Sequence, residues 1–542
     1  MRKILIPALG ALFMAMPAIA QTEHQHHHHD AGPETEKFGT VSFPTSCAAA
    51  SQAGITRGVA LLHSFDYTRA NQQFGQIAKD DPSCAMAHWG VAMTDYRELW
   101  GIPEESEIRH GAEEMAKARA AAASATPREQ AYIAALSAFF APADVSFGQR
   151  ALAYADKMDE LHKAFPDDVE GAAFDALAIL ASVPPTDTSL TRERQALAIL
   201  VPLFASHPDH PGLAHYIIHT CDTPALAQDG LAAAREYASI APSSPHALHM
   251  PGHIFARLGL WQEDIASNQA SVAASERAEA EGHPGAAHQM HAEEFLVYAW
   301  LQTGEEDKAR AMTARMREIG KHMMAMPGMD DMKGSGNFFD NELRAVTAME
   351  LHEWKELSKQ LPAPGSRPHA AMMTYWGQGI GAGHIGDVKA AKAALQGFDK
   401  GLEALKKTPY ADYEETMKVK RQEVEAWLIH AEGRDDDAVA TLRAAADQQD
   451  KLGQMEVDIP AREMLGDMLL LLHRPEEALA EYRIALTLSP HRLNGLLSAG
   501  QAAEQSGHAD EARAFYREAA LQTKDGHSRR ADLARAIKLA AG

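Results

Sequence analysis

Small and aromatic residues recur along the chain at a spacing of 34 positions, and they do so most clearly near the C-terminus. The two best units consist of Gly466, Ala478, Tyr482 and Ala485, and of Gly500, Ala512, Tyr516 and Ala519. Degenerate units carry Gly58, Ala70, Phe74 and Pro82; Gly252, Gly259 and Trp261; Gly304 and Ala309; Gly379, Gly386 and Ala391; and Gly433, Ala438 and Ala445. Small residues let two helices cross closely, and aromatic residues fill the spaces between helix pairs. No stretch alternates apolar and polar residues over the length of a strand, so the pattern predicts helical hairpins.

This pattern resembles the tetratricopeptide repeat (TPR), in which a Leu-Gly pair marks the first helix and Ala, an aromatic residue and Ala mark the second. Leu465-Gly466 and the residues that follow it carry the resemblance, which covers most of residues 51–526. It implies an all-α fold, an α-solenoid of about ten to twelve stacked helix-turn-helix hairpins. One hairpin cannot bury its own apolar face, so neighbouring hairpins must stack.

The first twenty residues have the composition of a secretory signal peptide. Arg2 and Lys3 precede an apolar stretch over 4–19, and Ala18-Ile19-Ala20 matches a cleavage signal. We expect cleavage before Gln21 and export to the periplasm or beyond, as in an exported bacterial TPR protein. The mature chain holds no run of 18 apolar residues, so we expect no integral membrane segment.

Three further segments are predicted after the signal peptide of residues 1–20. They are a His-rich disordered N-terminus over 21–45, an N-terminal TPR-like solenoid with a histidine-lined groove over 46–335, and a C-terminal TPR-like solenoid over 336–542. The His-rich segment contains His24, His26, His27, His28 and His29, a composition typical of metal binding.

Export implies an oxidising compartment, in which disulfides persist. Cys47 and Cys84 bracket the hairpin predicted over 54–82. The two ends of such a hairpin lie close together, as disulfide geometry requires, so we expect these two residues to be joined. Cys221 is then a lone thiol, which we interpret as a small buried apolar residue.

The resemblance implies that positions 2, 5, 9, 12 and 13 of each first helix line the concave groove. Residues four apart share one face of a helix, and adjacent helices lie about 8–10 Å apart. Pairs at these positions in successive units should therefore meet on one patch of the groove. Two histidine pairs occupy positions 5 and 9: His215 and His219 in the unit from Pro211, and His249 and His253 in the unit from Pro245.

Other candidate ligands surround these pairs. His246 occupies position 2 of its unit, and the unit that begins at Met290 places His291 at position 2 and Glu294 at position 5. A single pair is more often surface or capping chemistry, but recurrence at the repeat spacing favours a shared metal site over structural histidines. Pro251 removes a helix hydrogen bond and is expected to kink or begin a helix there. The predicted metal ligands are His215, His219, His246, His249, His253, His291 and Glu294.

Copper and zinc are the two candidates for the metal. A loop rich in Met and His favours copper, because thioether and imidazole ligands suit Cu(I). Methionines also fill irregular gaps in a core, and zinc fits the histidines equally well. The residues of the loop are His322, Met323, Met324, Met326, Met329 and Met332.

The net charge of the chain limits the classes of partner that we expect it to bind. The sequence has 51 Lys and Arg against 74 Asp and Glu, a formal net charge of −23. Nucleic acid is therefore not expected as a partner, because phosphate binding needs clustered Lys and Arg. The sequence contains no P-loop, G-x-S-x-G or H-E-x-x-H motif.

Three functional classes remain, and the first is favoured. It is a non-enzymatic exported TPR solenoid whose groove binds copper or zinc, a protein or peptide partner, or both. The second is a periplasmic metalloenzyme with a mono- or dinuclear histidine-ligated centre, either an oxidoreductase or a hydrolase. The third is a metal-free scaffold for protein interaction.

Overall fold

The computed structural model describes residues 36–541 except residues 100, 142–143, 185–186, 283–285, 326–334, 409 and 456. The predicted signal peptide, residues 21–35 of the His-rich segment, and most of the methionine-rich loop lie outside the described residues. The described residues form helices and no strand, which confirms the predicted all-α class.

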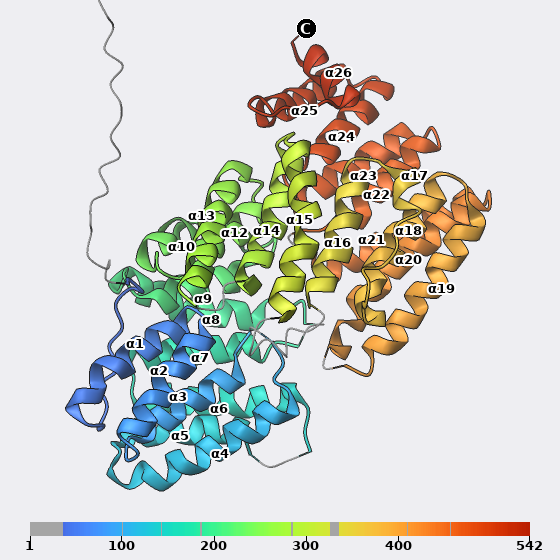
Figure 1. The fold of residues 1–542 in the computed structure, drawn as a ribbon. Coiled ribbons are helices and arrows are strands. Elements are labelled where there is room, and N and C mark those ends of the chain that lie inside the picture. The colour runs from blue at the N-terminus through green and yellow to red at the C-terminus, as the bar shows by residue number, and fades with distance from the viewer. Residues whose placement is uncertain are drawn as a thin grey trace, which may run out of the picture. The chain divides into compact units, whose positions relative to one another are not determined.

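The first nine α-helices are ordered along the chain from blue to green in Figure 1. Their bounds are α1 Gln52–His63, α2 Tyr67–Asp80, α3 Ala85–Tyr96, α4 Glu105–Ala121, α5 Pro127–Phe139, α6 Phe147–Ala164, α7 Val169–Ala181, α8 Thr191–Ser206 and α9 Pro211–Cys221. The 3₁₀-helices η1 Ala49–Ser51 and η2 Ala122–Ser124 precede α1 and α5.

The middle and C-terminal helices continue the order. The middle helices are α10 Ala227–Ile240, α11 Pro245–His249, α12 Pro251–Arg257, α13 Trp261–Ala280, α14 Ala286–Gln302, α15 Glu306–Ala325, α16 Ser335–Glu350 and α17 Trp354–Leu357. The C-terminal ones are α18 Pro368–His384, α19 Val388–Leu405, α20 Glu414–Ala431, α21 Asp435–Leu452, α22 Ala461–Leu471, α23 Pro475–Leu488, α24 Leu493–Gln505, α25 Ala509–Gln522 and α26 Ala531–Ala540. The 3₁₀-helix η4 Ala411–Tyr413 precedes α20.

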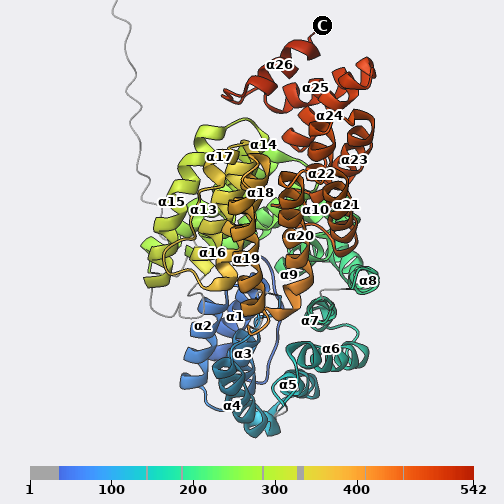
Figure 2. The ribbon, with the colours of Figure 1, turned by 90° about the vertical axis from the view of Figure 1, so that its right-hand side faces the viewer.

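Consecutive helices pack as hairpins that stack on their neighbours, as Figures 1 and 2 show. The described residues give twelve hairpins, with α11 and α12 together forming the first helix of one of them, and α26 packs after the last. The repeat pattern has a direct packing cause. A Cβ on Gly466 would lie 2.6 Å from the ring of Tyr482, and a Cβ on Gly500 would lie 2.3 Å from the ring of Tyr516. Glycine at this position therefore lets the two helices of each hairpin touch.

Helices far apart in the sequence also pack together. α1 lies against α9, and α14 lies against α24. Arg492, the residue before α24, supports the second contact because its buried guanidinium donates to the hydroxyl of Tyr298 on α14. The same guanidinium donates to Glu463 on α22 and to Glu350 on α16, each at 2.7 Å. The repeats are thus joined by long-range contacts as well as by neighbour stacking.

The apolar core does not divide at the predicted boundary between residues 335 and 336. Among the described residues the two largest apolar clusters run from Phe38 to Phe255 and from Ala256 to Ala536, and a smaller one from Met290 to Leu343 spans that boundary, while Lys37–Gly542 forms one unit. α15 and α16, which lie on either side of residues 335 and 336, pack on each other as other consecutive helices do.

The predicted disorder over 21–45 is wrong for residues 37–45. Phe43 is 1% exposed and stacks on Trp89 with ring centroids 5.4 Å apart. The backbone N–H of Thr40 donates to the carbonyl of Asp209 at 2.8 Å. These contacts hold the segment against α3 and against the turn between α8 and α9.

Cys47 and Cys84 form a disulfide across the first hairpin, and Cys221 is a buried free thiol. Within the part of the chain that the structure describes, none of the helices combines the length and apolar character of a membrane span.

Candidate metal centre

The predicted histidines lie on consecutive first helices of three neighbouring hairpins. α9 carries His215 and His219, α11 and α12 carry His246, His249 and His253, and α14 carries His291. Figure 1 shows α9, α12 and α14 in the green part of the chain. The helix starts at Pro211 and Pro245 agree with the predicted unit starts, whereas α14 begins at Ala286, before the predicted Met290.

The ligand atoms of these histidines fall into two groups of three. The nitrogen atoms within each group lie within 4.8 Å of one another. We call His215, His219 and His246 the α9 set, and His249, His253 and His291 the α12 set. The two sets touch, because the rings of His219 and His253 have centroids 6.3 Å apart and those of His246 and His249 have centroids 6.1 Å apart. The two predicted pairs therefore share a patch, but each pair takes its third imidazole from the next hairpin.

A phenylalanine ring lies over each set. Phe65 lies over the α9 set, with its ring centroid 4.4 Å from that of His215 and 5.4 Å from that of His219. Phe295 lies over the α12 set, 5.0 Å from His249 and 4.8 Å from His253. Phe65 has a positive φ of 52°, a backbone conformation that costs energy in a non-glycine residue.

The Nδ1 atoms of the α12 set are held by oxygen atoms. His249 Nδ1 lies 2.6 Å from Asn268 Oδ1, and His253 Nδ1 lies 2.8 Å from Asp222 Oδ2. His291 Nδ1 lies 3.1 Å from Glu294 Oε2. Glu294, predicted as a ligand, thus contacts a histidine of the set. Metal-binding histidines commonly donate their other ring N–H to such oxygen atoms, which fixes the tautomer and the ring orientation.

The direction of two of these hydrogen bonds is fixed. A carboxylate only accepts, so His253 donates from Nδ1 to Asp222. Asn268 donates its own amide to Asp264 at 2.6 Å, which turns Oδ1 toward His249 and makes His249 Nδ1 the donor. In the neutral rings the lone pairs are then on Nε2.

The two Nε2 atoms that carry these lone pairs face each other. His249 Nε2 and His253 Nε2 are 3.0 Å apart, a distance at which two acceptors repel unless a cation or a proton lies between them. Burial and the neighbouring imidazoles His291 and His253 lower the pKa of His249 well below its usual value, which disfavours the proton. The arrangement therefore suits a metal ion bound to two neutral imidazoles.

The α9 set has a similar local geometry. His215 Nδ1 lies 2.6 Å from the carbonyl oxygen of His63 and must donate to it, which leaves the Nε2 lone pair directed at His246 Nε2, 3.0 Å away. Burial lowers the pKa of His215 to about 3 and that of His246 well below its usual value. His219 is half-buried, as is His291 in the other set, so each set has one edge near solvent.

The local sequence explains how the α12 set is built across a proline. Pro251 lacks an N–H, so the helix breaks at Met250 into α11 and α12, as predicted. Met250 keeps helical dihedrals, φ −51° and ψ −36°, so His249 and His253 still share one face. A Cβ on Gly252 would lie 2.6 Å from Asn268 Nδ2, so glycine there lets α13 bring Asn268 close to His249.

A third group, formed by His63, His210 and Glu170, has the composition of a metal site, but hydrogen bonds within the protein already occupy its ring nitrogen atoms. Leu213 N–H donates to His210 Nδ1 at 3.2 Å, so His210 Nε2 carries a proton toward Glu170, 3.2 Å away. His63 Nε2 lies 2.7 Å from the same carboxylate oxygen, and its Nδ1 lies 2.8 Å from the Tyr216 hydroxyl. The two histidines hold the pKa of Glu170 well below its usual range, against the effect of burial. This group is a charge-stabilised hydrogen-bond network.

Sequence reasoning did not include several residues of the centre. His288 lies beside the α9 set, with its ring centroid 5.4 Å from that of His246, and its spacing of three from His291 could have indicated it. Asn268, Phe65 and the carbonyl of His63 have no sequence signal, since they reach the site only through tertiary packing.

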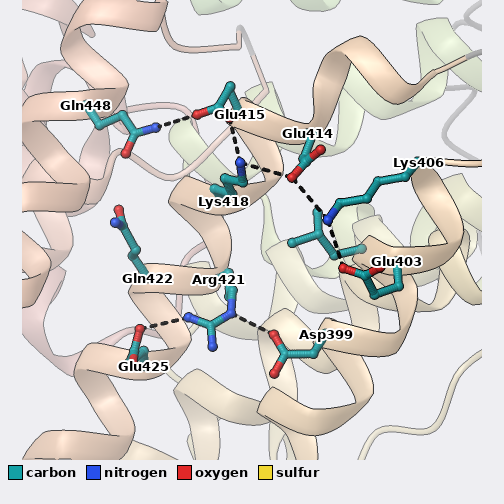
Figure 3. Close-up of a pocket in the computed structure, with 11 residues that line it drawn as sticks. Asp399, Glu403, Lys406, Glu414, Glu415, Lys418, Arg421, Gln422, Glu425 and Gln448 are labelled. Atoms are coloured by element: carbon teal, nitrogen blue, oxygen red, sulfur yellow. Dashed lines mark hydrogen bonds and ion pairs between the residues drawn. The ribbon is translucent and has the colours of Figure 1, made fainter.

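A depression elsewhere on the surface is lined by charged residues of α19, α20 and α21 (Figure 3). Its cations are paired with its anions: Lys406 with Glu403, Lys418 with Glu415, and Arg421 with Asp399. Exposed pairs of this kind contribute little free energy, and here they occupy the charged groups with one another. The depression therefore gives no indication of a binding site.

No protein-family model matches the chain, and no curated protein matches it. Among solved structures it is similar to a human IFIT1 dimer with m7Gppp-AAAA, at 13% identity over 84% of this chain and 90% of that chain, with a TM-score of 0.37. It is also similar to the P58(IPK) TPR domain, at 16% identity over 71% of this chain and 98% of that chain, with a TM-score of 0.20. Scores this low carry no argument about ligands. The helices of the chain itself define its class, a TPR-like α-solenoid.

Proposed function

We propose that this protein is a solenoid that binds a transition metal, copper or zinc, through buried histidines on neighbouring hairpins. The solenoid provides the general part of this function, because helical repeats present extended surfaces for recognition. Metal binding is the specific part of the proposal, and the α12 set supports it.

The observation that carries the proposal is the contact between His249 Nε2 and His253 Nε2. Both rings are fixed as Nδ1–H donors, so two lone pairs meet at 3.0 Å in a buried position. Such an arrangement is costly in the metal-free protein and favourable around a cation. Three imidazoles with carboxylates behind two of them form a donor set that suits Zn(II) and both oxidation states of copper.

The first experiment is elemental analysis of the mature protein purified from its native compartment, followed by thermal melting with and without a chelator. A bound ion that prefers the folded state stabilises it by about 2.7 kcal/mol when free metal is at 100 times Kd. We expect the melting temperature to fall with the chelator and to recover with Cu(I) or Zn(II).

The variant His253→Ala tests the site, and His508→Ala is the matched control. His508 is a half-exposed histidine paired with Glu476, far along the chain from either set. We expect His253→Ala to lose metal and His508→Ala to retain it. Equal metal content and equal melting of wild type and His253→Ala at every metal concentration would refute the proposal and favour the metal-free scaffold.

A further inference from the structure

The two histidine sets are related by the repeat. His215 and His219 occupy the same two positions of their unit that His249 and His253 occupy 34 residues later. In both cases the pair lies one helical turn apart and the third imidazole comes from the first helix of the following hairpin, His246 of α11 or His291 of α14. The same construction therefore occurs twice, displaced by one hairpin.

This displacement separates the two groups of ligand atoms. First helices of adjacent hairpins pack about 8–10 Å apart, so equivalent positions on them cannot coincide. One ligand nitrogen from each of His215, His219 and His246 lies within 4.8 Å of the other two, and the same holds for His249, His253 and His291, so the ligand atoms form two separate groups of three. Each set thus brings three nitrogen atoms together, and three imidazoles are a sufficient protein donor set for one copper or zinc ion.

We propose that the chain holds two metal ions, one in the α9 set and one in the α12 set, at neighbouring positions along the solenoid. This inference rests on the proposed function, because it assigns a second site made by the same repeat. The ligand of the α9 set is a second ion of the metal class that the α12 set binds, Cu(I) or Zn(II).

The two sites fill in order. Asp222 and Glu294 place negative charge directly behind two rings of the α12 set, which favours the first cation there. The second ion then binds next to a like charge and is weakened by it. The repulsion scales with the product of the charges, so it is about fourfold smaller for two Cu(I) ions than for two Zn(II) ions. The two binding steps should be well separated with zinc and closer together with Cu(I).

The test is native mass spectrometry of the full mature chain, titrated with Zn(II) alone and with Cu(I) alone, in wild type and four variants. The variants are His219→Ala, His253→Ala, the double variant and His508→Ala. Ions lost relative to wild type are counted, so metal held by residues outside the two sets cancels. Each single variant should lose one ion, the double variant two, and His508→Ala none. His219→Gln and His253→Gln repeat the count if an alanine variant fails to fold.

The remaining outcomes separate the two proposals. If the double variant loses only the one ion that each single variant loses, the sets share a single ion; this inference is wrong and the proposed function stands. If only His253→Ala loses an ion, the α9 set binds none and this inference is again wrong. If no variant loses an ion, both proposals are wrong.

Discussion

Asp222 accepts two hydrogen bonds that an asparagine cannot both accept. Oδ2 lies 2.8 Å from His253 Nδ1, and Oδ1 accepts from Arg257 Nε at 2.9 Å. In Asp222→Asn the amide nitrogen must face one of these donors. If the amide nitrogen faces Arg257, two hydrogen-bond donors oppose each other. If it faces His253, it donates to Nδ1, so the ring proton must lie on Nε2, and Nε2 then cannot bind a metal.

Loss of such a partner typically weakens metal binding about 10- to 100-fold, or by about 1.4 to 2.7 kcal/mol. At a free metal concentration 1,000 times the wild-type Kd, the stabilisation by metal is about 4.1 kcal/mol, and a tenfold loss of affinity reduces it to about 2.7 kcal/mol. The assay is competition with a chelating dye for Zn(II) and Cu(I), together with urea unfolding at that fixed metal concentration.

The matched control is Asp435→Asn, because Asp435 Oδ1 also lies 2.8 Å from a histidine Nδ1, that of His430, away from the metal sets. We expect Asp435→Asn to bind metal as the wild type does. If Asp222→Asn and Asp435→Asn bind metal with the same affinity, Asp222 does not support a metal ligand, and the argument from hydrogen-bond direction is refuted.

Three further predictions concern stability. The Cys47–Cys84 disulfide closes a 37-residue separation and should contribute about 4 kcal/mol by the chain-entropy model; thiol labelling of denatured, unreduced protein should find one free thiol, Cys221, and three free thiols would contradict it. Arg492→Ala leaves Glu463 and Glu350 buried without their cation and should cost about 3–5 kcal/mol in urea unfolding; a loss under about 1 kcal/mol would show that the carboxyl groups simply take up protons. His384 is stacked between Trp354 and Trp427, and burial, with some repulsion from His352 and His430, holds its pKa well below 6.5. Its contribution to stability is full above about pH 6.5 and is lost as the pH falls below that value, because the unfolded chain then binds the proton more readily. Urea unfolding of metal-free protein from about pH 7.5 to about pH 5 should therefore show a weaker pH dependence in His384→Gln than in wild type, and an equal or steeper dependence in the variant would contradict this.

Several features of the fold follow from local sequence, and these were predicted. Proline at the first helical position fixes the starts of α9 and α11, because its missing N–H has no partner there in any case. The spacing of glycine and tyrosine predicts the hairpins α22–α23 and α24–α25, because the ring fills the space that the missing Cβ leaves. The spacing of four places His215 with His219 and His249 with His253, since the helical period alone brings such residues to one face.

The place where the two largest apolar clusters meet, between Phe255 and Ala256, was not predictable in this way. The sequence break at the methionine-rich loop looks like the end of a solenoid, yet α15 and α16 pack together across it. Packing between helices depends on how their surfaces fit, and a loop of any length can join two helices that fit.

The sequence by itself determined an all-α repeat chain and the two histidine pairs, because both depend on interactions within a few residues or on one repeated spacing. Only the tertiary structure decided that the pairs divide into two sets of three, completed by His246 and His291 from the next hairpins. It also decided the state of each nitrogen: the carbonyl of His63, 152 residues away, fixes the tautomer of His215, and Asp222, 31 residues away, fixes that of His253. A histidine carries the same two ring nitrogen atoms wherever it lies in a sequence. Whether it binds a metal or only a proton depends on which atoms the packed helices place opposite each nitrogen, as the fully satisfied His63 shows beside the facing lone pairs of His249 and His253.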